Sequence, residues 1–278
     1  MKIMLWIAGT LGLLAVFALW LPHFVEGRFY YPRRGASAYT PQSVGLAYED
    51  VYFSSVDGAR LHGWFIPALG KARGLVLQVH GNAGRLENHL DSIRWLPEKG
   101  YAVFAFDYRA YGLSEDKTPT PKALMEDTQS AIAYLQSRKD MAAPKLWLLA
   151  QSLGGNNAIA AKAHGKIGGV AGMVLDSTFY SYQSIVNDKI PGAGIFISDR
   201  YSASQFIAQL APLPLFFLHG DQDRTIPWQH SQKLYELASA PKQIRILPGV
   251  RHMGALESPE VRAAILRFFE QPAKITVP

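Results

Sequence analysis

The sequence contains no cysteine in its 278 residues. This absence excludes a disulfide scaffold, zinc or iron–sulfur sites with cysteine ligands, thiol catalysis and a lipid-modified cysteine. Charged residues are also few, at 18% against 49% hydrophobic residues, which excludes a disordered chain. The 24 Gly and 17 Pro follow no collagen period and form no low-complexity tract. We therefore expect one large domain with a substantial core.

The sequence also lacks the signatures of several binding classes. The net charge is +6, but Lys2, Arg28, Arg33 and Arg34 all flank one apolar stretch, so the rest of the chain is only mildly basic. There is no basic stripe interleaved with aromatics and no phosphate-binding loop, so no nucleic-acid partner is predicted. There is no H-E-x-x-H metal motif and no dinucleotide fingerprint, so we predict no cofactor and no metal.

The N-terminal apolar stretch covers residues 3–21 and carries no charge. A helix of this length measures roughly 28 Å at about 1.5 Å per residue, which matches the hydrocarbon core of a bilayer. No small-x-small cleavage site follows, which favours a single transmembrane anchor at residues 1–21 over a cleaved signal, the alternative. The membrane is thus a predicted partner. Lys2 opposes Arg28 and the two arginines beyond it, so the side of the membrane that carries the domain stays open.

The remaining chain divides into a connector at 22–48, a domain at 49–270 and a tail at 271–278. Asp57-Gly58 predicts a hairpin between the first two strands of the domain. Six later apolar runs lack alternation, which is typical of parallel strands buried on both faces. We predict an α/β fold with a mostly parallel eight-stranded sheet flanked by helices. The expected strands are Asp50–Ser54, Leu61–Pro67, Leu75–Val79, Ala102–Phe106, Leu146–Leu149, Met173–Leu175, Leu215–Leu218 and Ile244–Leu247.

Helical periodicity lies between these strands. Three segments place apolar residues on one helical face, and a fourth, Asn156–His164, continues from a strand-to-helix turn. Ser258-Pro259 supplies an N-cap and a first-turn proline for the last of them. Residues 177–211 form a longer, Ser- and aromatic-containing excursion that we interpret as a lid or wall over a site. The expected helices are Pro121–Arg138, Asn156–His164, Ser231–Ala238 and Pro259–Glu270.

Ser152 follows the strand Leu146–Leu149 within the sequence AQSLGG. A serine on a sharp strand-to-helix turn needs small neighbours because its backbone is strained, and Ala150, Gly154 and Gly155 meet that need. The turn presents the hydroxyl at the carboxyl edge of the sheet, so we predict Ser152 as a nucleophile. The alternative reading is an ordinary N-cap serine.

A nucleophilic serine needs a base and an acid that orients the base. His252 follows the last strand, and Asp223 follows the strand Leu215–Leu218. The chain order Ser152, Asp223, His252 is the order expected for such groups at one edge of this kind of sheet. We therefore predict His252 as general base and Asp223 as its acid, with Asp176 as a rival acid at a neighbouring strand end.

A developing oxyanion also needs donors. The backbone N–H of Leu153 lies at the start of a helix, and the turn His80-Gly81-Asn82-Ala83-Gly84 can supply a second N–H, that of Asn82. We read His80 and His219 as satisfied polar core residues. Asp107 and Arg109 are interpreted as scaffold that holds loops by charge-assisted bonds.

Five motifs in order, HGNAG, DYRAYGLS, AQSLGG, HGDQDRTIP and GVRHMG, make residues 45–270 resemble an α/β-hydrolase of the serine aminopeptidase-like and monoglyceride-lipase-like branch, in its membrane-anchored microbial form. The resemblance implies the α/β-hydrolase fold, a triad of Ser152, Asp223 and His252, and an oxyanion hole from Asn82 and Leu153. Two positions depart from the pattern, because Ala150 and Ala110 replace glycines.

Three functions follow as hypotheses. The leading one is a serine hydrolase that cleaves carboxylic esters or thioesters of a small-molecule, lipid-like substrate through an acyl-enzyme. The second is a serine peptidase or aminopeptidase, for which Glu115 and Asp116 would have to hold a free amino terminus. The third is a non-catalytic, membrane-anchored binding scaffold.

Overall fold

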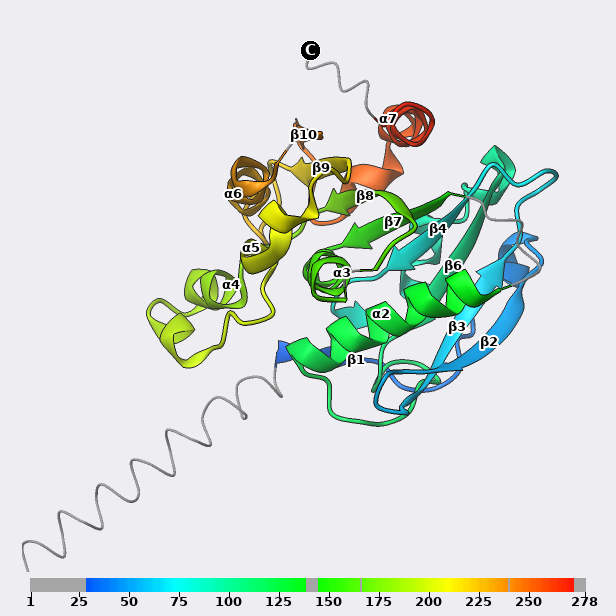
Figure 1. Cartoon of the computed structure of the whole chain (residues 1–278), viewed down its shortest axis with the longest axis horizontal. Coiled ribbons are helices and arrows are strands. Elements are labelled where there is room, and N and C mark those ends of the chain that lie inside the picture. The colour runs from blue at the N-terminus through cyan, green and yellow to red at the C-terminus, as the bar shows by residue number, and fades with distance from the viewer. Residues whose placement is uncertain (1–28, 139–144, 166, 240, 273–278) are drawn as a thin grey trace, which may run out of the picture.

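The structure is a computed structural model that describes residues 29–138, 145–165, 167–239 and 241–272. Its centre is a twisted eight-stranded sheet with the order β10-β9-β8-β7-β4-β6-β3-β2 (Figure 1). All eight predicted strands are present, six of them longer by one or two residues, β8 longer by four and β3 shifted by one. They are β2 (Glu49–Ser54), β3 (Arg60–Ile66), β4 (Gly74–Val79), β6 (Tyr101–Asp107), β7 (Leu146–Gln151), β8 (Val170–Asp176), β9 (Leu215–Gly220) and β10 (Lys242–Leu247).

The sheet is parallel except at one end, where β3 pairs antiparallel with both β2 and β6. The strands β4, β6, β7 and β9 are buried at every position, as their unalternating sequences predict. The prediction was wrong for β10, which is only half-buried along its length. It is the edge strand, so only one neighbour, β9, covers it within the described residues.

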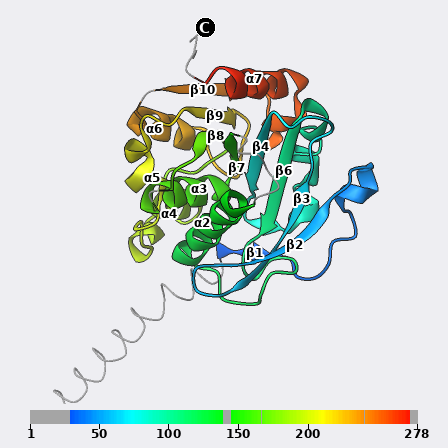
Figure 2. The ribbon, with the colours of Figure 1, turned by 45° about the vertical axis from the view of Figure 1, so that its right-hand side comes forward.

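Helices cover both faces of the sheet (Figure 2). One core contains apolar residues of α2, α3 and α6, and the other contains those of α7 and the short turns at 86–99. The predicted cap of α7 is present, because Ser258 accepts the Val261 N–H. Thr120 caps α2 in the same way, by accepting the Ala123 N–H. The helices are α2 (Pro121–Ser137), α3 (Leu153–His164), α4 (Tyr182–Lys189), α5 (Ala203–Phe206), α6 (Gln229–Leu237) and α7 (Pro259–Glu270).

Residues 29–48 are bonded to the domain. The short strand β1 (Tyr31–Pro32) pairs in parallel with β5 (Ala83–Gly84), and Arg34 bridges to Gly112. The described part of the predicted connector therefore lies across the loops that follow β4 and β6. Residues 177–211, predicted as a lid or wall, contain α4 and α5.

The predicted anchor at residues 3–21 lies outside the described residues. Among the residues that the structure does describe, no helix combines the length and hydropathy that a membrane span requires.

Candidate active site

Ser152 lies at the turn between β7 and α3 with φ 54° and ψ −120°. A positive φ is unusual for a residue other than glycine, and it indicates a strained backbone held by its surroundings. Gly154 and Gly155 allow this turn. A Cβ on Gly154 would lie 1.9 Å from the Val79 carbonyl oxygen, and one on Gly155 would lie 1.9 Å from Thr178 Oγ1. The small residues that the sequence places here are thus required by contact with β4 and with the loop after β8.

The two alanines that replace glycines have different surroundings. Ala150 is buried at the end of β7, where its methyl group is accommodated in regular strand geometry. Ala110 has φ 67°, a left-handed conformation that glycine adopts without strain. Neither alanine displaces Ser152 from the turn.

The structure brings Ser152, His252 and Asp223 together from three loops at the carboxyl edge of the sheet. Ser152 Oγ lies 3.1 Å from His252 Nε2. His252 Nδ1 lies 2.6 Å from Asp223 Oδ2. This arrangement is consistent with an imidazole whose Nδ1–H donates to the carboxylate while Nε2 accepts from the hydroxyl.

Asp223 accepts hydrogen bonds on both carboxylate oxygens. Oδ1 accepts from the backbone N–H groups of Thr225 and Ile226, at 2.8 and 2.9 Å. Oδ2 accepts from His252 and, at 3.1 Å, from Nε2 of the buried His219. Burial alone would raise the pKa of Asp223, but the bonds from His219 and His252 outweigh it and hold that pKa well below its usual range. Asp223 is therefore a carboxylate at neutral pH.

His219 is a site residue that sequence reasoning missed, because it was read only as a polar core residue. Its Nδ1 accepts from Ser231 Oγ at 2.7 Å, which leaves Nε2–H to donate to Asp223 and to the Ile226 carbonyl. The sequence does place His219 four residues before Asp223. That spacing indicates a contact between the two side chains only once the conformation of the turn after β9 is known.

The rival acid Asp176 is also fully buried, and burial raises the pKa of its carboxyl group. It accepts from Gln151 Nε2 at 3.0 Å and from Ser177 Oγ at 3.1 Å. The carboxylate in hydrogen-bond contact with His252 is that of Asp223. Asp176 instead supports the end of the strand before Ser152, because its backbone carbonyl accepts from the Ser152 N–H.

The predicted oxyanion donors flank the same serine. Gly81 packs against it, because a Cβ there would lie 3.5 Å from Ser152 Cβ. The hydrogen bonds found among the described residues do not use the backbone N–H of Asn82 or of Leu153 as a donor, so both groups are available to a ligand.

The loop that carries Asn82 is held from three sides. Tyr111 Oη donates to the Asn82 carbonyl at 2.7 Å, and Tyr108 Oη donates to the His80 carbonyl at 2.9 Å. The Asn82 side chain donates to the Phe29 carbonyl and accepts from the Tyr31 N–H. The segment before β2 therefore fixes the loop at which an oxyanion would bind.

His80 and His89 form a buried aromatic stack beneath this loop, with ring centroids 4.8 Å apart. Burial lowers the pKa of His89 to about 4 and that of His80 well below its usual value, so both are neutral. His80 Nε2 lies 3.6 Å from Asp107, and burial raises the pKa of Asp107 to about 8. His80 is therefore a core residue, as predicted, but the prediction that it is satisfied was wrong, because its Nε2 has no hydrogen-bond partner among the described residues. The protonated carboxyl group of Asp107 was not expected from the sequence.

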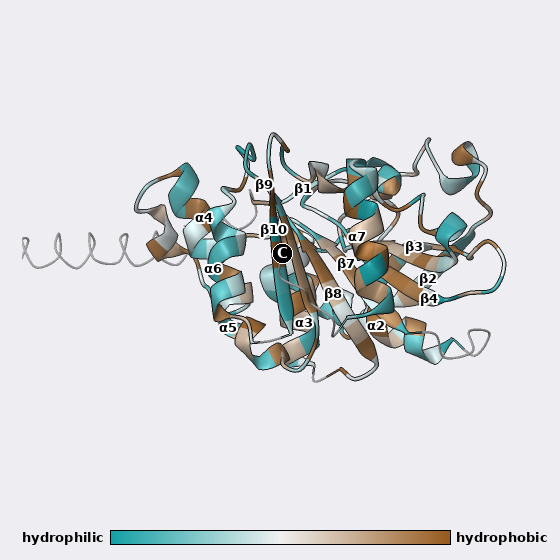
Figure 3. Cartoon of the chain, turned by 90° about the horizontal axis from the view of Figure 1, so that it is seen from above, coloured by the Kyte–Doolittle hydropathy of each residue, from teal (hydrophilic) through white to brown (hydrophobic). Residues whose placement is uncertain are grey.

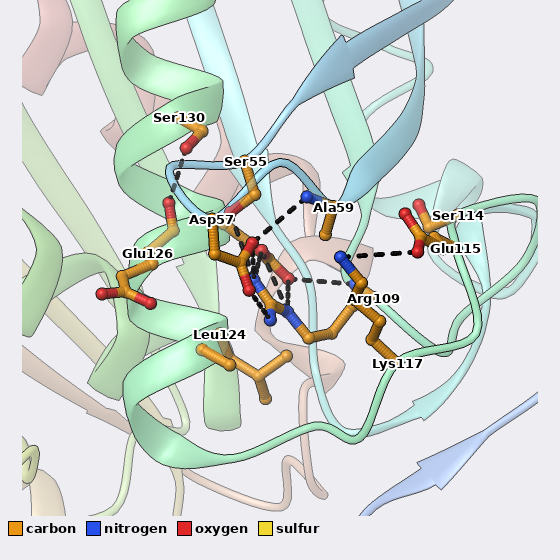
Figure 4. Close-up of polar contacts among 12 residues, drawn as sticks. Ser55, Asp57, Ala59, Arg109, Ser114, Glu115, Lys117, Leu124, Glu126 and Ser130 are labelled. Atoms are coloured by element: carbon orange, nitrogen blue, oxygen red, sulfur yellow. Dashed lines mark hydrogen bonds and ion pairs between the residues drawn. The ribbon is translucent and has the colours of Figure 1, made fainter.

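Arg109 is scaffold of the kind that the sequence predicts (Figure 4). Its guanidinium group forms a two-point contact with the buried Asp127 of α2 at 2.6 and 3.0 Å, and Nη1 donates to Asp57 at 2.7 Å. These bonds connect the β2–β3 hairpin, the loop after β6 and α2. Glu115 is engaged nearby, since it accepts from the Arg60 backbone N–H and pairs with Lys117. Among the described residues, no group of three or more His, Asp or Glu side chains forms a metal site.

A doubly flanked, mostly parallel sheet with a strained serine after a central strand defines the class of α/β-hydrolases. Comparison with known proteins agrees. Residues 70–198 match the family model of serine aminopeptidase S33. The chain is 42% identical over 266 residues to YfhR of Salmonella typhimurium, covering 90% of this chain and 89% of that one. It is 31% identical over 219 residues to the α/β-hydrolase domain-containing protein WAV2 of Arabidopsis thaliana, covering 72% of this chain and 70% of that protein. The chain belongs to the α/β-hydrolase superfamily.

Solved structures share the fold. The esterase Pf2001 of Pyrococcus furiosus superposes with a TM-score of 0.71 at 21% identity, covering 86% of this chain and 98% of that one. The esterase EaEST of Exiguobacterium antarcticum has a TM-score of 0.63 at 14% identity, covering 80% of this chain and 100% of that one. These similarities and the family support a hydrolase.

Proposed function

We propose that this protein is a serine hydrolase that cleaves carboxylic ester or thioester bonds through an acyl-enzyme. The observation that carries the proposal is the hydrogen-bonded line from Ser152 Oγ through His252 to Asp223, with distances of 3.1 and 2.6 Å. A nucleophile, a base and an orienting acid in this order are the groups that acyl transfer requires.

In the first half of the reaction, Ser152 Oγ attacks the acyl carbon while His252 Nε2 takes the hydroxyl proton. The carbonyl oxygen becomes an oxyanion that accepts from the N–H groups of Asn82 and Leu153. His252, now an imidazolium, is stabilised by the Asp223 carboxylate and gives its proton to the leaving alcohol or thiol. The ester bond breaks and the acyl group remains on Ser152.

In the second half, water attacks the acyl-enzyme. His252 accepts a proton from this water and returns it to Ser152 Oγ as the carboxylic acid leaves. No other co-reactant is needed. The shared oxygen of Asp223 keeps the imidazole oriented through both halves, because His219 and His252 hold it from two sides.

The substrate class follows from the membrane expectation. An uncharged run at residues 3–21 would tether the domain to a bilayer, so the proposed substrate is a lipid-like acyl ester. Two of the structurally similar proteins, Pf2001 and EaEST, are esterases, which favours the same chemistry. Glu115 is bonded to Arg60 and Lys117, so it is not set to hold a peptide amino terminus.

The test is labelling of the detergent-solubilised full chain with a fluorophosphonate, followed by mass spectrometry of the adduct. We expect the adduct on Ser152, its loss in Ser152→Ala, and its retention in Ser137→Ala, which removes an exposed hydroxyl on α2. A series of p-nitrophenyl esters from acetate to laurate then measures acyl preference. Labelling that persists in Ser152→Ala would contradict the nucleophile assignment, and folded wild-type protein without label would favour a binding scaffold.

The match of residues 70–198 to the serine aminopeptidase S33 family supports peptidase activity as a second candidate. Amino-acid p-nitroanilides distinguish the two, since they offer an amide bond to the same serine. Turnover of these amides at rates above those of the esters would replace the ester hypothesis.

A further inference from the structure

The loop beyond α4 exposes large apolar side chains to solvent. Ile195 is 77% exposed, Ile190 63% and Phe196 46%, all within residues 190–196, which we call the lid tip. The ribbon beyond α4 is brown at this place in the hydropathy view (Figure 3). Single exposed apolar residues are common, but three on one short protrusion indicate a surface that contacts something apolar.

The lid tip is a built structure. Gly194 N–H donates to Asn187 Oδ1 at 2.7 Å, and Gln183 Nε2 donates to the Ile197 carbonyl at 2.9 Å. Gly192 takes φ 84°, which permits the reversal after α4. The tip is therefore held in a conformation that keeps its apolar side chains outward, where they cannot join the core.

The charges around the lid tip favour an anionic surface. Lys189, Arg200 and Arg224 are exposed beside it, and Lys189 Nζ bonds the Arg224 carbonyl. Asp188 and Asp199 lie among them, and their contacts with His230 and Ser202 Oγ leave both carboxylates charged, so the rim has three cations against two anions. An apolar tip whose rim carries a small cationic excess matches the interface of a bilayer that contains anionic lipids.

The chain itself brings this face near a membrane. Phe29 packs on Phe179 and on Tyr182 of α4, with ring centroids 6.2 and 5.6 Å apart. Residues 22–28 separate it from the uncharged run that ends at Leu21, so Phe29 and Leu21 are at most about 28 Å apart at roughly 3.5 Å per residue. From there, α4 leads to the lid tip over about 12 Å at 1.5 Å per residue.

We propose that the lid tip docks into the surface of the bilayer that holds the N-terminal apolar run, and that the site draws its acyl substrate from that bilayer. The proposal rests on the proposed ester hydrolysis and deepens it by naming the source of substrate. Ser152 is only 6% exposed, while Phe29 contacts both α4 and the oxyanion loop through Asn82. Phe29 thus contacts both the helix that leads to the lid tip and the loop that lies beside Ser152.

The first test uses the absence of native cysteine. Ile195→Cys in the full chain is labelled with an environment-sensitive nitrobenzoxadiazole dye and reconstituted into phosphatidylethanolamine vesicles that contain phosphatidylglycerol. The control is Leu69→Cys, 56% exposed at the opposite edge of the sheet, between β3 and β4. We expect blue-shifted emission and quenching by doxyl-labelled lipid at Ile195 only. If iodide quenches the dye at position 195 as strongly as the dye at position 69, docking is overturned. If the dye at position 195 is protected from iodide but is not quenched by the doxyl lipid, a second copy of the protein covers it, and docking is again overturned.

The second test separates docking from chemistry. Ile195→Glu with Phe196→Glu should leave hydrolysis of soluble p-nitrophenyl acetate unchanged and lower hydrolysis of monoacylglycerol in the same vesicles by roughly tenfold or more. Leu69→Glu should change neither rate. Equal loss on both substrates, or no loss on vesicles, overturns the proposal. Wild-type protein that hydrolyses neither substrate while its Ile195 probe is quenched by lipid rejects the hydrolase function and leaves docking intact.

Discussion

His219 and His252 donate to the same oxygen of Asp223, with Nε2 of His219 at 3.1 Å and Nδ1 of His252 at 2.6 Å. One imidazole faces the serine and the other faces the core, where Ser231 and Ile226 fix it. Asp223 is therefore held by a histidine that makes no contact with Ser152. This relationship makes His219 a positioning residue for the proposed triad.

Replacing His219 tests this role. We expect His219→Ala to lower kcat for p-nitrophenyl acetate by about tenfold with little change in KM, because Asp223 loses one donor and orients His252 less well. His219→Gln, which keeps an N–H donor, is the matched control and should recover much of the rate. Equal losses in both variants would reduce His219 to a packing residue.

Tyr111 offers a test of the oxyanion loop. Its hydroxyl donates to the Asn82 carbonyl at 2.7 Å, so Tyr111→Phe frees the peptide unit that precedes Ala83 and loosens the Asn82 amide. We expect kcat to fall about threefold to tenfold with KM unchanged, less than the loss from deleting an oxyanion donor itself. Tyr201→Phe, on the loop before α5, is the control. A rise in KM at constant kcat would instead place Tyr111 in substrate binding.

Arg109 is expected to matter for stability alone. Arg109→Lys removes the two-point contact with the buried Asp127 and leaves this carboxylate with at most one donor from that side chain. The free energy of unfolding should drop by about 2 kcal/mol, because lysine keeps the charge but loses a hydrogen bond to a buried carboxylate. Urea unfolding measures this, and the exposed Arg94→Lys serves as reference. Because Arg109 lies away from Ser152, turnover per folded molecule should stay near wild type, and a selective loss of turnover would show that the scaffold reading is incomplete.

The sheet was predictable because its strands are unalternating apolar runs, which only burial on both faces explains. Ser152, Asp223 and His252 were predictable as neighbours because each follows a strand whose carboxyl end lies at one edge, and their catalytic roles stay a prediction. His219 and the bonds from Phe29 and Tyr31 to Asn82 were not predictable. They depend on loop conformations and on contacts between distant segments, which leave no period or spacing in the chain. The half-buried β10 was mispredicted because an apolar run does not reveal which strand is at the edge.

Asp107 predicts how stability depends on pH. Burial raises its pKa to about 8, so the folded chain keeps a proton there that the unfolded chain, with a carboxyl pKa of about 4, has lost. Because the folded state binds more protons, stability falls as pH rises through this window.

His89, with its pKa lowered to about 4, opposes this fall below about pH 6.5, since the unfolded chain then binds the extra proton. The interval from about pH 6.5 to about 8 therefore separates Asp107 from His89. Asp107→Asn keeps an acceptor for the Leu86 N–H but cannot ionise, so its free energy of unfolding should decline less across that interval than that of the wild type. Urea unfolding in detergent micelles, followed by tryptophan fluorescence at both ends of the interval, measures the two slopes, and parallel curves would mean that Asp107 is already ionised in the folded protein.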